Sequence, residues 1–117
     1  MTSKELSNVY IKIIGPKTLA DGSMDDFTWE FDNDYVLRHI FIKADGEAPV
    51  KSTVTISIDE NTITKDKALC NTFGTNANNA LLLNIPVRRS QHFKASIKNL
   101  EGAQKDFTVE LVLELAG

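Results

Sequence analysis

Apolar and polar residues alternate along most of this chain with a period of two, which is the spacing of a β-strand with one buried face. The clearest example is the stretch 105–116, which reads K-D-F-T-V-E-L-V-L-E-L-A. Its phenylalanine, its first valine and its leucines share one parity, and its two glutamates share the other. A helical period would mix the glutamates into the apolar stripe, so the pattern predicts a strand. A strand of this length needs neighbours in a sheet and a second apolar layer over it.

Further strands are predicted at 8–14, 27–31, 35–44, 51–58, 62–64, 80–87 and 91–98. Gly15-Pro16 is expected to end the first of them, because proline cannot donate to a ladder. Residues 35–44 carry apolar residues on both parities, which predicts a central strand covered on both sides for part of its length. The polar stretch 65–79 is expected to be an exposed loop, and Pro86 indicates an edge or a bulge.

Short strands separated by turn signals, with no helical segment and no repeat, predict an all-β fold, an antiparallel β-sandwich of about eight strands. The long connections favour a single jelly roll over an immunoglobulin-like sandwich, whose cysteine pair a chain with 1 cysteine cannot form. We expect residues 8–117 to form a single β-sandwich domain and residues 1–7 to be a flexible polar lead.

Composition narrows the classes of function. The chain has 117 residues, of which 42% are hydrophobic and 25% charged, as in globular domains that bury a core without staples. The net charge of -3 and the scattered basic residues argue against nucleic acid or an anionic membrane as a partner. Arg88-Arg89 is interpreted as a solvated strand end rather than as a contact for an acidic partner. The chain has no long apolar run and no signal-peptide pattern at its start, and we expect synthesis in a reducing cytoplasm.

The sequence contains no clear arrangement for catalysis, and we expect neither enzyme activity nor a cofactor nor a metal. The two histidines, His39 and His92, lie far apart in strand patterns and lack the spacing of a metal site. An enzyme would require them to converge with a carboxylate. Neither Ser90 nor Cys70 has the context of an activated nucleophile, and Cys70 is interpreted as a small buried side chain.

Two binding functions stay open as alternatives. Loop carboxylates beside the aromatic stretch 27–31 could bind calcium, although turn formation explains the same residues. These carboxylates are Asp21, Asp25, Asp26, Asp32 and Asp34. Trp29 and Tyr35 could stack on a sugar in a carbohydrate- or receptor-binding module. We interpret Trp29 as a core residue, because it shares parity with Phe27 and Phe31.

The chain runs through F-T-W-E-F-D-N-D-Y-V-L-R-H-I-F-I-K-A, S-T-V-T-I-S-I-D-E, A-L-L-L-N-I-P-V, Q-H-F-K-A-S-I-K-N and F-T-V-E-L-V-L-E-L. This succession, over roughly residues 25–115, resembles small single-jelly-roll virion structural proteins of double-stranded DNA bacteriophages. The resemblance implies a non-enzymatic minor capsid, decoration or spike-associated protein that is located in the virion. It also implies contacts with other capsid or spike subunits and a homo-oligomer such as a trimer. It implies no catalytic or binding residues.

Subunit contacts would use apolar residues that point outward. On the first strand, Val9, Ile11 and Ile13 share one face, and Tyr10 and Ile14 lie on the other. The outward apolar positions, and therefore the candidate subunit contacts, are Tyr10, Ile14, Leu82 and Val112. The alternative for each is an ordinary exposed hydrophobic residue, which most proteins have.

Overall fold

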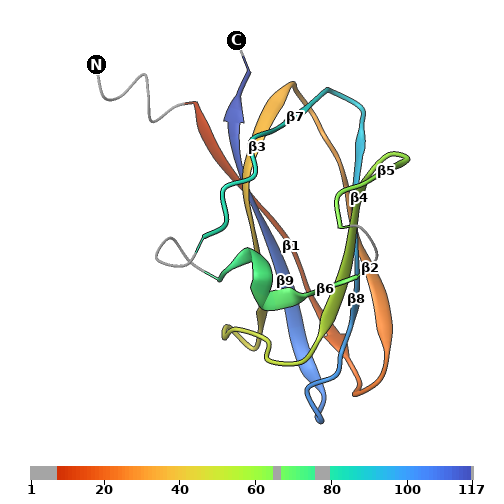
Figure 1. Ribbon diagram of the computed structural model, residues 1–117. Helices are drawn as coiled ribbons and strands as arrows, with labels where there is room; N and C mark the ends of the chain where they lie inside the picture. Colours follow the sequence, from red (N-terminus) through yellow and green to blue (C-terminus); the bar gives the residue numbers. More distant parts are fainter. Residues whose placement is uncertain (1–7, 65–66, 76–79, 117) are drawn as a thin grey trace.

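The structure is a computed structural model that describes residues 8–64, 67–75 and 80–116, so the predicted lead at 1–7 lies outside the described residues. It is an antiparallel β-sandwich of two sheets (Figure 1), which confirms the predicted all-β class. The strands in chain order are β1 (Val9–Leu19), β2 (Met24–Glu30), β3 (Tyr35–Ala44), β4 (Thr53–Ile58), β5 (Asn61–Thr62), β6 (Ala68–Leu69), β7 (Ile85–Val87), β8 (His92–Lys98) and β9 (Lys105–Leu115). A short 3-10 helix, η1 (Cys70–Phe73), follows β6.

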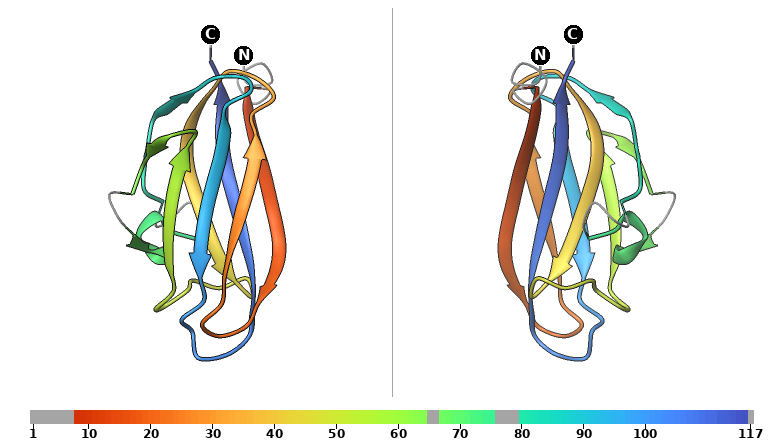
Figure 2. Two further views of the ribbon diagram at one scale, coloured as in Figure 1. Left: turned by 90° about the vertical axis from the view of Figure 1, so that its right-hand side faces the viewer. Right: turned by 90° about the vertical axis from the view of Figure 1, so that its left-hand side faces the viewer.

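Successive strands alternate between the two sheets from β1 to β4 and again from β7 to β9, whereas β4, β5 and β6 belong to one sheet. One sheet has the order β1-β9-β3-β7 and the other β2-β8-β4-β5, with β6 paired to β4 outside that path. Figure 2 shows the β2-β8-β4 sheet from outside in its left panel and the β1-β9-β3 sheet in its right panel. Because the connections cross between the sheets, segments far apart in sequence become neighbours, as where Val9 pairs with Glu114.

The core lies between the sheets and is built from alternate residues of the long strands. Phe93, Ala95 and Ile97 of β8 are fully buried, as the alternation predicted. The same prediction is confirmed for β4 and β9, and β5 folds back on β4 in the predicted hairpin. The largest fully buried side chains are the phenylalanines Phe27, Phe31, Phe93 and Phe107. Burial of apolar surface of this kind is the main favourable contribution to folding.

β1 differs from its prediction in both length and orientation. The strand continues past Gly15-Pro16 to Leu19, because the register against β9 shifts after Ile14 and forms a β-bulge. Gly15 has a φ of +104°, and a Cβ at this position would lie 2.9 Å from the carbonyl oxygen of Phe107, so only glycine fits. Ile14 is buried, with 8% of its surface exposed. The prediction that Ile14 points outward was therefore wrong.

β3 has the predicted bounds and lies between β9 and β7 in its sheet. A second bulge shifts its register between Leu37 and His39, so that the inward residues change parity from Leu37 to Ile40. The apolar residues on both parities thus partly reflect the bulge. Phe41 is a buried residue on the outer side of the strand, and the His39 ring stacks on it with centroids 5.8 Å apart.

The segment around η1 packs into the core, where an exposed loop was predicted. Cys70 and Phe73 are 0% and 4% exposed, and both belong to the core cluster. The segment bridges the two sheets, because β6 pairs with β4 and η1 contacts β3 (Figure 1). The prediction of an exposed loop was wrong for Cys70 and for residues 73–75, which are buried, whereas Asn71 and Thr72 are exposed. Residues 65–66 and 76–79 lie outside the described residues.

Only the end of the predicted strand 80–87 is a strand. β7 pairs with β3 and forms the edge of its sheet, as Pro86 indicated. The preceding residues follow an irregular path beside β3, in which Leu83 N donates to Arg38 O at 2.9 Å. The N–H of Leu81 donates to Phe73 O at 3.2 Å, and Leu81 is 41% exposed. Leu81 therefore lies outside the core, although the alternation of apolar residues in 80–87 put it on the same face as Val87.

Candidate functional site on the outer faces of the sheets

The outer face of the β1-β9-β3 sheet carries a row of exposed apolar side chains. Val9, Ile11 and Ile13 of β1 point away from the core and are 47%, 64% and 55% exposed. In the register of the sheet, Ile11 lies beside Val112 of β9, and Val112 lies beside His39 of β3. We call Val9, Ile11, Ile13 and Val112 the apolar strip. Its strands lie side by side in the right panel of Figure 2.

Ion pairs that join β3 to β9 border the apolar strip. Arg38 Nη2 lies 3.2 Å from Glu114 Oε1, and Lys43 Nζ lies 3.2 Å from Glu110 Oε1. The side chains of both pairs are partly exposed, so the pairs add little to stability. The pairs place positive and negative groups side by side on this surface, so a partner surface that carries both signs of charge can form ion pairs with them.

The strip lies next to a strand edge without a partner. β1 is the end strand of its sheet, and among the described residues it pairs with β9 alone. An exposed edge strand that carries apolar side chains is a template for pairing with another chain. The bulge at Gly15-Pro16 interrupts the second half of this edge, so residues 9–14 form its continuous part.

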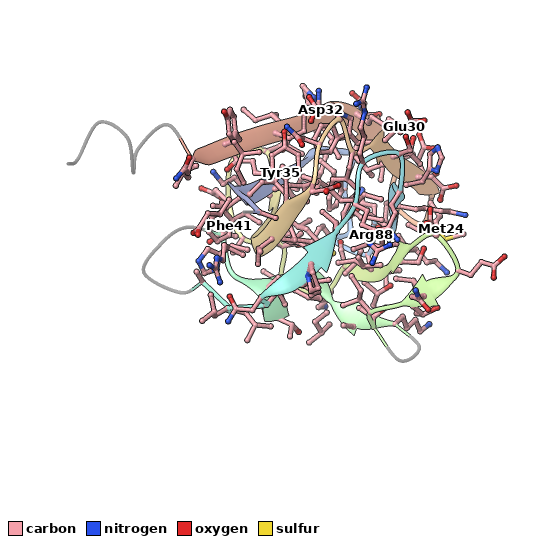
Figure 3. All side chains as sticks on the ribbon, turned by 90° about the horizontal axis from the view of Figure 1, so that it is seen from above. Met24, Glu30, Asp32, Tyr35, Phe41 and Arg88 are labelled. Carbon is pink, nitrogen blue, oxygen red and sulfur yellow. The ribbon has the colours of Figure 1, made fainter. Side chains whose placement is uncertain are left out.

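The outer face of the β2-β8-β4 sheet is polar instead. Its outward residues are mostly charged or hydroxyl-bearing: Asp26, Thr28, Glu30, Thr53, Thr55, Ser57, His92, Lys94, Ser96 and Lys98. Several are paired, as where Lys94 Nζ lies 3.6 Å from Asp26 Oδ2. Figure 3, seen from above, shows Phe41 and Glu30 on opposite sides of the molecule, on the outer sides of the two sheets. The two outer faces therefore differ in chemistry.

The structure places the four candidate contact residues in different environments. Leu82 is 58% exposed, and Val112 is half-buried within the apolar strip. Tyr10 is 44% exposed, but its ring packs edge-on against Tyr35 with centroids 5.9 Å apart. Ile14, as shown above, lies in the core. The contact role of the exposed residues stays a prediction.

Sequence reasoning missed the outward side chains of β1. Both parities of residues 8–14 are largely apolar, so the period of two is present but does not say which face is buried. The bulge after Ile14 and the pairing with β9 set the face, and neither can be recognised in one sequence.

Trp29 and Tyr35 do not form an open platform for a sugar. Tyr35 is 6% exposed, and its hydroxyl donates to Asp32 Oδ1 at 2.6 Å (Figure 3). Burial, and next this hydrogen bond, raise the pKa of Tyr35 to about 12. Trp29 is half-buried at the border of the core against Phe31, with ring centroids 5.1 Å apart. Lys12 Nζ lies 5.5 Å from the Trp29 ring centroid, so a stacking sugar would have to displace it.

The two histidines lie on the outer faces of opposite sheets and cannot converge on one ligand. His39 Nδ1 is 2.9 Å from the carbonyl oxygen of Leu81. His92 Nε2 lies 3.1 Å from Glu30 Oε1, and its Nδ1 lies 3.5 Å from Asp59 Oδ1. Among the residues that the structure describes, no three histidine, cysteine or acidic side chains are grouped so that they could hold a metal ion.

The aspartates beside β2 have separate structural partners. Asp21 Oδ1 accepts a hydrogen bond from the N–H of Gly102 at 2.9 Å, and Asp34 Oδ1 accepts one from the N–H of Arg89 at 2.8 Å. Asp21 precedes β2 and Asp34 follows it, so these carboxylates lie near opposite ends of the strand. Turn and loop bonding accounts for both residues.

Cys70 is fully buried, which confirms its interpretation as a small core side chain. Burial, and next the negative charge of Glu101, raise the pKa of its thiol to about 12. A thiol in this environment is a poor nucleophile, because the thiolate is the reactive form.

Comparison with protein-family models, with curated proteins and with solved structures found no match. In the part of the chain that the structure describes, no helix is long and apolar enough to cross a membrane.

Proposed function

We propose that this protein is a non-enzymatic virion structural subunit, of the minor capsid, decoration or spike-associated kind, which assembles with copies of itself through the apolar strip. Two observations support a structural role. The strand orders of the two sheets, β1-β9-β3-β7 and β2-β8-β4-β5, are compatible with a single jelly roll. The pattern of segments from β2 to β9 resembles small jelly-roll virion proteins of bacteriophages.

The main observation that supports self-assembly is the contrast between the two outer faces. Val9, Ile11 and Ile13 each leave about half or more of their surface in water, although they occupy consecutive outward positions of one strand. Grouped apolar residues on one face, opposite a face of charged and hydroxyl side chains, indicate a surface that another protein covers.

A second copy of this chain is the partner that the surroundings of the strip fit best. The free edge of β1 at residues 9–14 is continuous with the strip, so an identical edge can extend the sheet while the two strips become contiguous. The bordering pairs Arg38–Glu114 and Lys43–Glu110 present both signs of charge. Two identical surfaces related by symmetry can therefore place opposite charges against each other.

Light scattering across a concentration series tests the assembly. We expect the wild-type chain to form a symmetric oligomer, and Ile11→Lys to weaken its association at least tenfold, because a charge would be buried in the contact. Thr28→Lys is the matched control, since it adds the same charge to an exposed strand position on the opposite face. A wild-type chain that is monomeric up to millimolar concentration, or equal effects of both variants, would contradict the proposal.

The virion part of the proposal has its own test. Mass spectrometry of purified particles of the virus that encodes this chain should detect it in a fixed ratio to the major capsid protein. Detection only in the soluble lysate, and never in particles, would contradict a virion role and leave the assembly to be explained otherwise.

The alternative is a carbohydrate- or receptor-binding module. Its predicted aromatic platform is weakened by the burial of Tyr35 and by Lys12 over the Trp29 ring. The surface that best supports such a module is a depression on the polar outer face of the β2-β8-β4 sheet, which is described next.

A further inference from the structure

A depression of about 380 Å³ lies on the outer face of the β2-β8-β4 sheet, at the end where β2 begins. Its lining residues are Gly22, Met24, Thr53, Thr55, Lys67, Ser96 and Lys98. A volume of this order lies at the lower end of the range for small-molecule sites and suits a ligand the size of one sugar unit.

The register of the sheet explains how the depression forms. Lys98 of β8 lies between Met24 of β2 and Thr53 of β4, and these three side chains form one row of the floor. In the next row, Ser96 of β8 lies beside Thr55 of β4. The turn before β2 borders the row on one side, and Lys67, the residue directly before β6, borders it on the other, since β6 pairs with the start of β4.

The depression is positively charged, although the whole chain has a net charge of -3. Two lysines, Lys67 and Lys98, are among its lining residues, and among the described residues no aspartate or glutamate lines it. Among the described residues, Asp26 lies beside Ser96 in the register of this face, and it is already engaged. It accepts a hydrogen bond from Ser96 Oγ at 2.6 Å and lies 3.6 Å from Lys94 Nζ. An anion placed in the depression would thus meet two lysines.

Hydroxyl side chains supply the other half of the recognition. A hydroxyl can both donate and accept, which is the property that sugar hydroxyls require of a binding site. Ser96 donates to Asp26 and so keeps its oxygen lone pairs for a ligand. Met24, which is 65% exposed at the end of the floor row, offers an apolar and polarisable contact for the C–H groups of a sugar ring (Figure 3).

We propose that this depression binds an anionic saccharide, a sugar unit that carries a carboxylate or a sulfate. The acidic group lies between Lys67 and Lys98, and the ring hydroxyls meet Thr53 and Ser96. The site lies on the face opposite the apolar strip, so it stands or fails independently of the oligomer proposed above.

Chemical-shift titration of the isotope-labelled full chain tests this site. The probes are glucuronic acid and glucose 6-sulfate, with neutral glucose, acetate and inorganic sulfate as controls. We expect the acidic sugars to shift the amide signals of residues 22–24, 53–55 and 96–98, and glucose to bind at least tenfold more weakly. Lys98→Gln should weaken the acidic sugars roughly tenfold to hundredfold, as expected for the loss of a charged hydrogen bond. Arg88→Gln, an equal loss of charge in an exposed turn outside the depression, should leave binding unchanged.

Several results would overturn the proposal. One is the absence of shifts in these three segments at tens of millimolar of either acidic sugar. Another is equal binding of glucose, which would remove the role of the lysines. A third is equal binding of acetate or inorganic sulfate, which would reduce the depression to a general anion site. Differences between glucuronic acid and glucose 6-sulfate decide which acidic group the lysines prefer.

Discussion

Glu101 Oε2 accepts hydrogen bonds from both the N–H and the hydroxyl of Ser52, at 2.8 and 2.6 Å. The same carboxylate accepts the N–H groups of Val50 and Lys51 at 2.8 and 2.9 Å. Ser52 Oγ in turn accepts from the N–H of Leu100 at 3.0 Å. This group of bonds links the approach to β4 with the turn between β8 and β9, two segments about fifty residues apart in sequence.

We expect the free energy of unfolding to depend on pH through Glu101. Burial alone would raise its pKa, but the hydrogen bonds from Ser52 and from the backbone of residues 50–52 outweigh burial and lower the pKa from 4.5 to about 2. Because the pKa is lower in the folded state, the stabilisation is fully present above pH 4.5 and is lost as the pH falls towards 2. Glu101→Gln should cost about 1–3 kcal/mol at pH 7 and much less at pH 2. Urea unfolding, followed by the fluorescence of Trp29, measures both values.

Glu60→Gln is the control for this prediction. Glu60 lies exposed in the turn after β4, so its replacement should change stability by less than about 0.5 kcal/mol at either pH. If Glu101→Gln and Glu60→Gln lost the same stability at pH 7, the bonds between Glu101 and the 50–52 backbone would have no net effect.

The orientation of β1 can be tested with two neighbouring isoleucines. Ile14 is 8% exposed and Ile13 is 55% exposed. Ile14→Ala should therefore destabilise the chain by roughly 2–4 kcal/mol through lost burial and a residual cavity. Ile13→Ala should cost less than about 1 kcal/mol, mainly through lower strand propensity. Denaturant titrations at equal, low protein concentration separate the two effects from any change in association. A larger loss for Ile13→Ala would reverse the faces of β1.

The sequence predicted best where one parity was apolar and the other polar. In β8, Phe93, Ala95 and Ile97 alternate with His92, Lys94, Ser96 and Lys98, so only one face could be buried without burying charge. Such strands fix their own orientation. β1 lacks this contrast, and its bulge allows the strand to continue through a proline. The alternation with a period of two could therefore not predict that Ile14 is buried.

Neither outer face could be read from the sequence as a site. The apolar strip joins residues near 9–13 to Val112, and the depression joins Met24, Thr53 and Lys98. These neighbours arise from strand order, which one sequence does not contain. The core position of Phe73 likewise depends on η1 bridging from β4 towards β3, whereas its flanking residues are polar and typical of a loop.

Two glycines that both have a positive φ should respond differently to alanine. Gly15 and Gly46 have φ values of +104° and +79°, so a side chain is strained at either position. Gly46→Ala should cost about 1–2 kcal/mol, since an added Cβ meets no atom within 4 Å. Gly15→Ala should cost clearly more, because its Cβ would lie 2.9 Å from the backbone oxygen of Phe107 and would disturb the β1–β9 bulge. Thermal unfolding of both variants checks the order, and equal losses would show that the bulge adapts.

Alkylation of Cys70 should report global unfolding of the chain. The thiol is 0% exposed, and burial followed by the charge of Glu101 raises its pKa to about 12, so iodoacetamide cannot react with the folded form at pH 8. If alkylation proceeds through the unfolded chain, its rate should rise in Glu101→Gln by the same factor as the equilibrium constant of unfolding. That factor is tenfold for about each 1.4 kcal/mol by which the free energy of unfolding falls. Mass spectrometry of timed samples gives both rates. Labelling could instead be faster than the unfolding equilibrium permits and equally fast in the wild type and in Glu101→Gln. That result would mean that η1 opens locally while the two sheets stay paired.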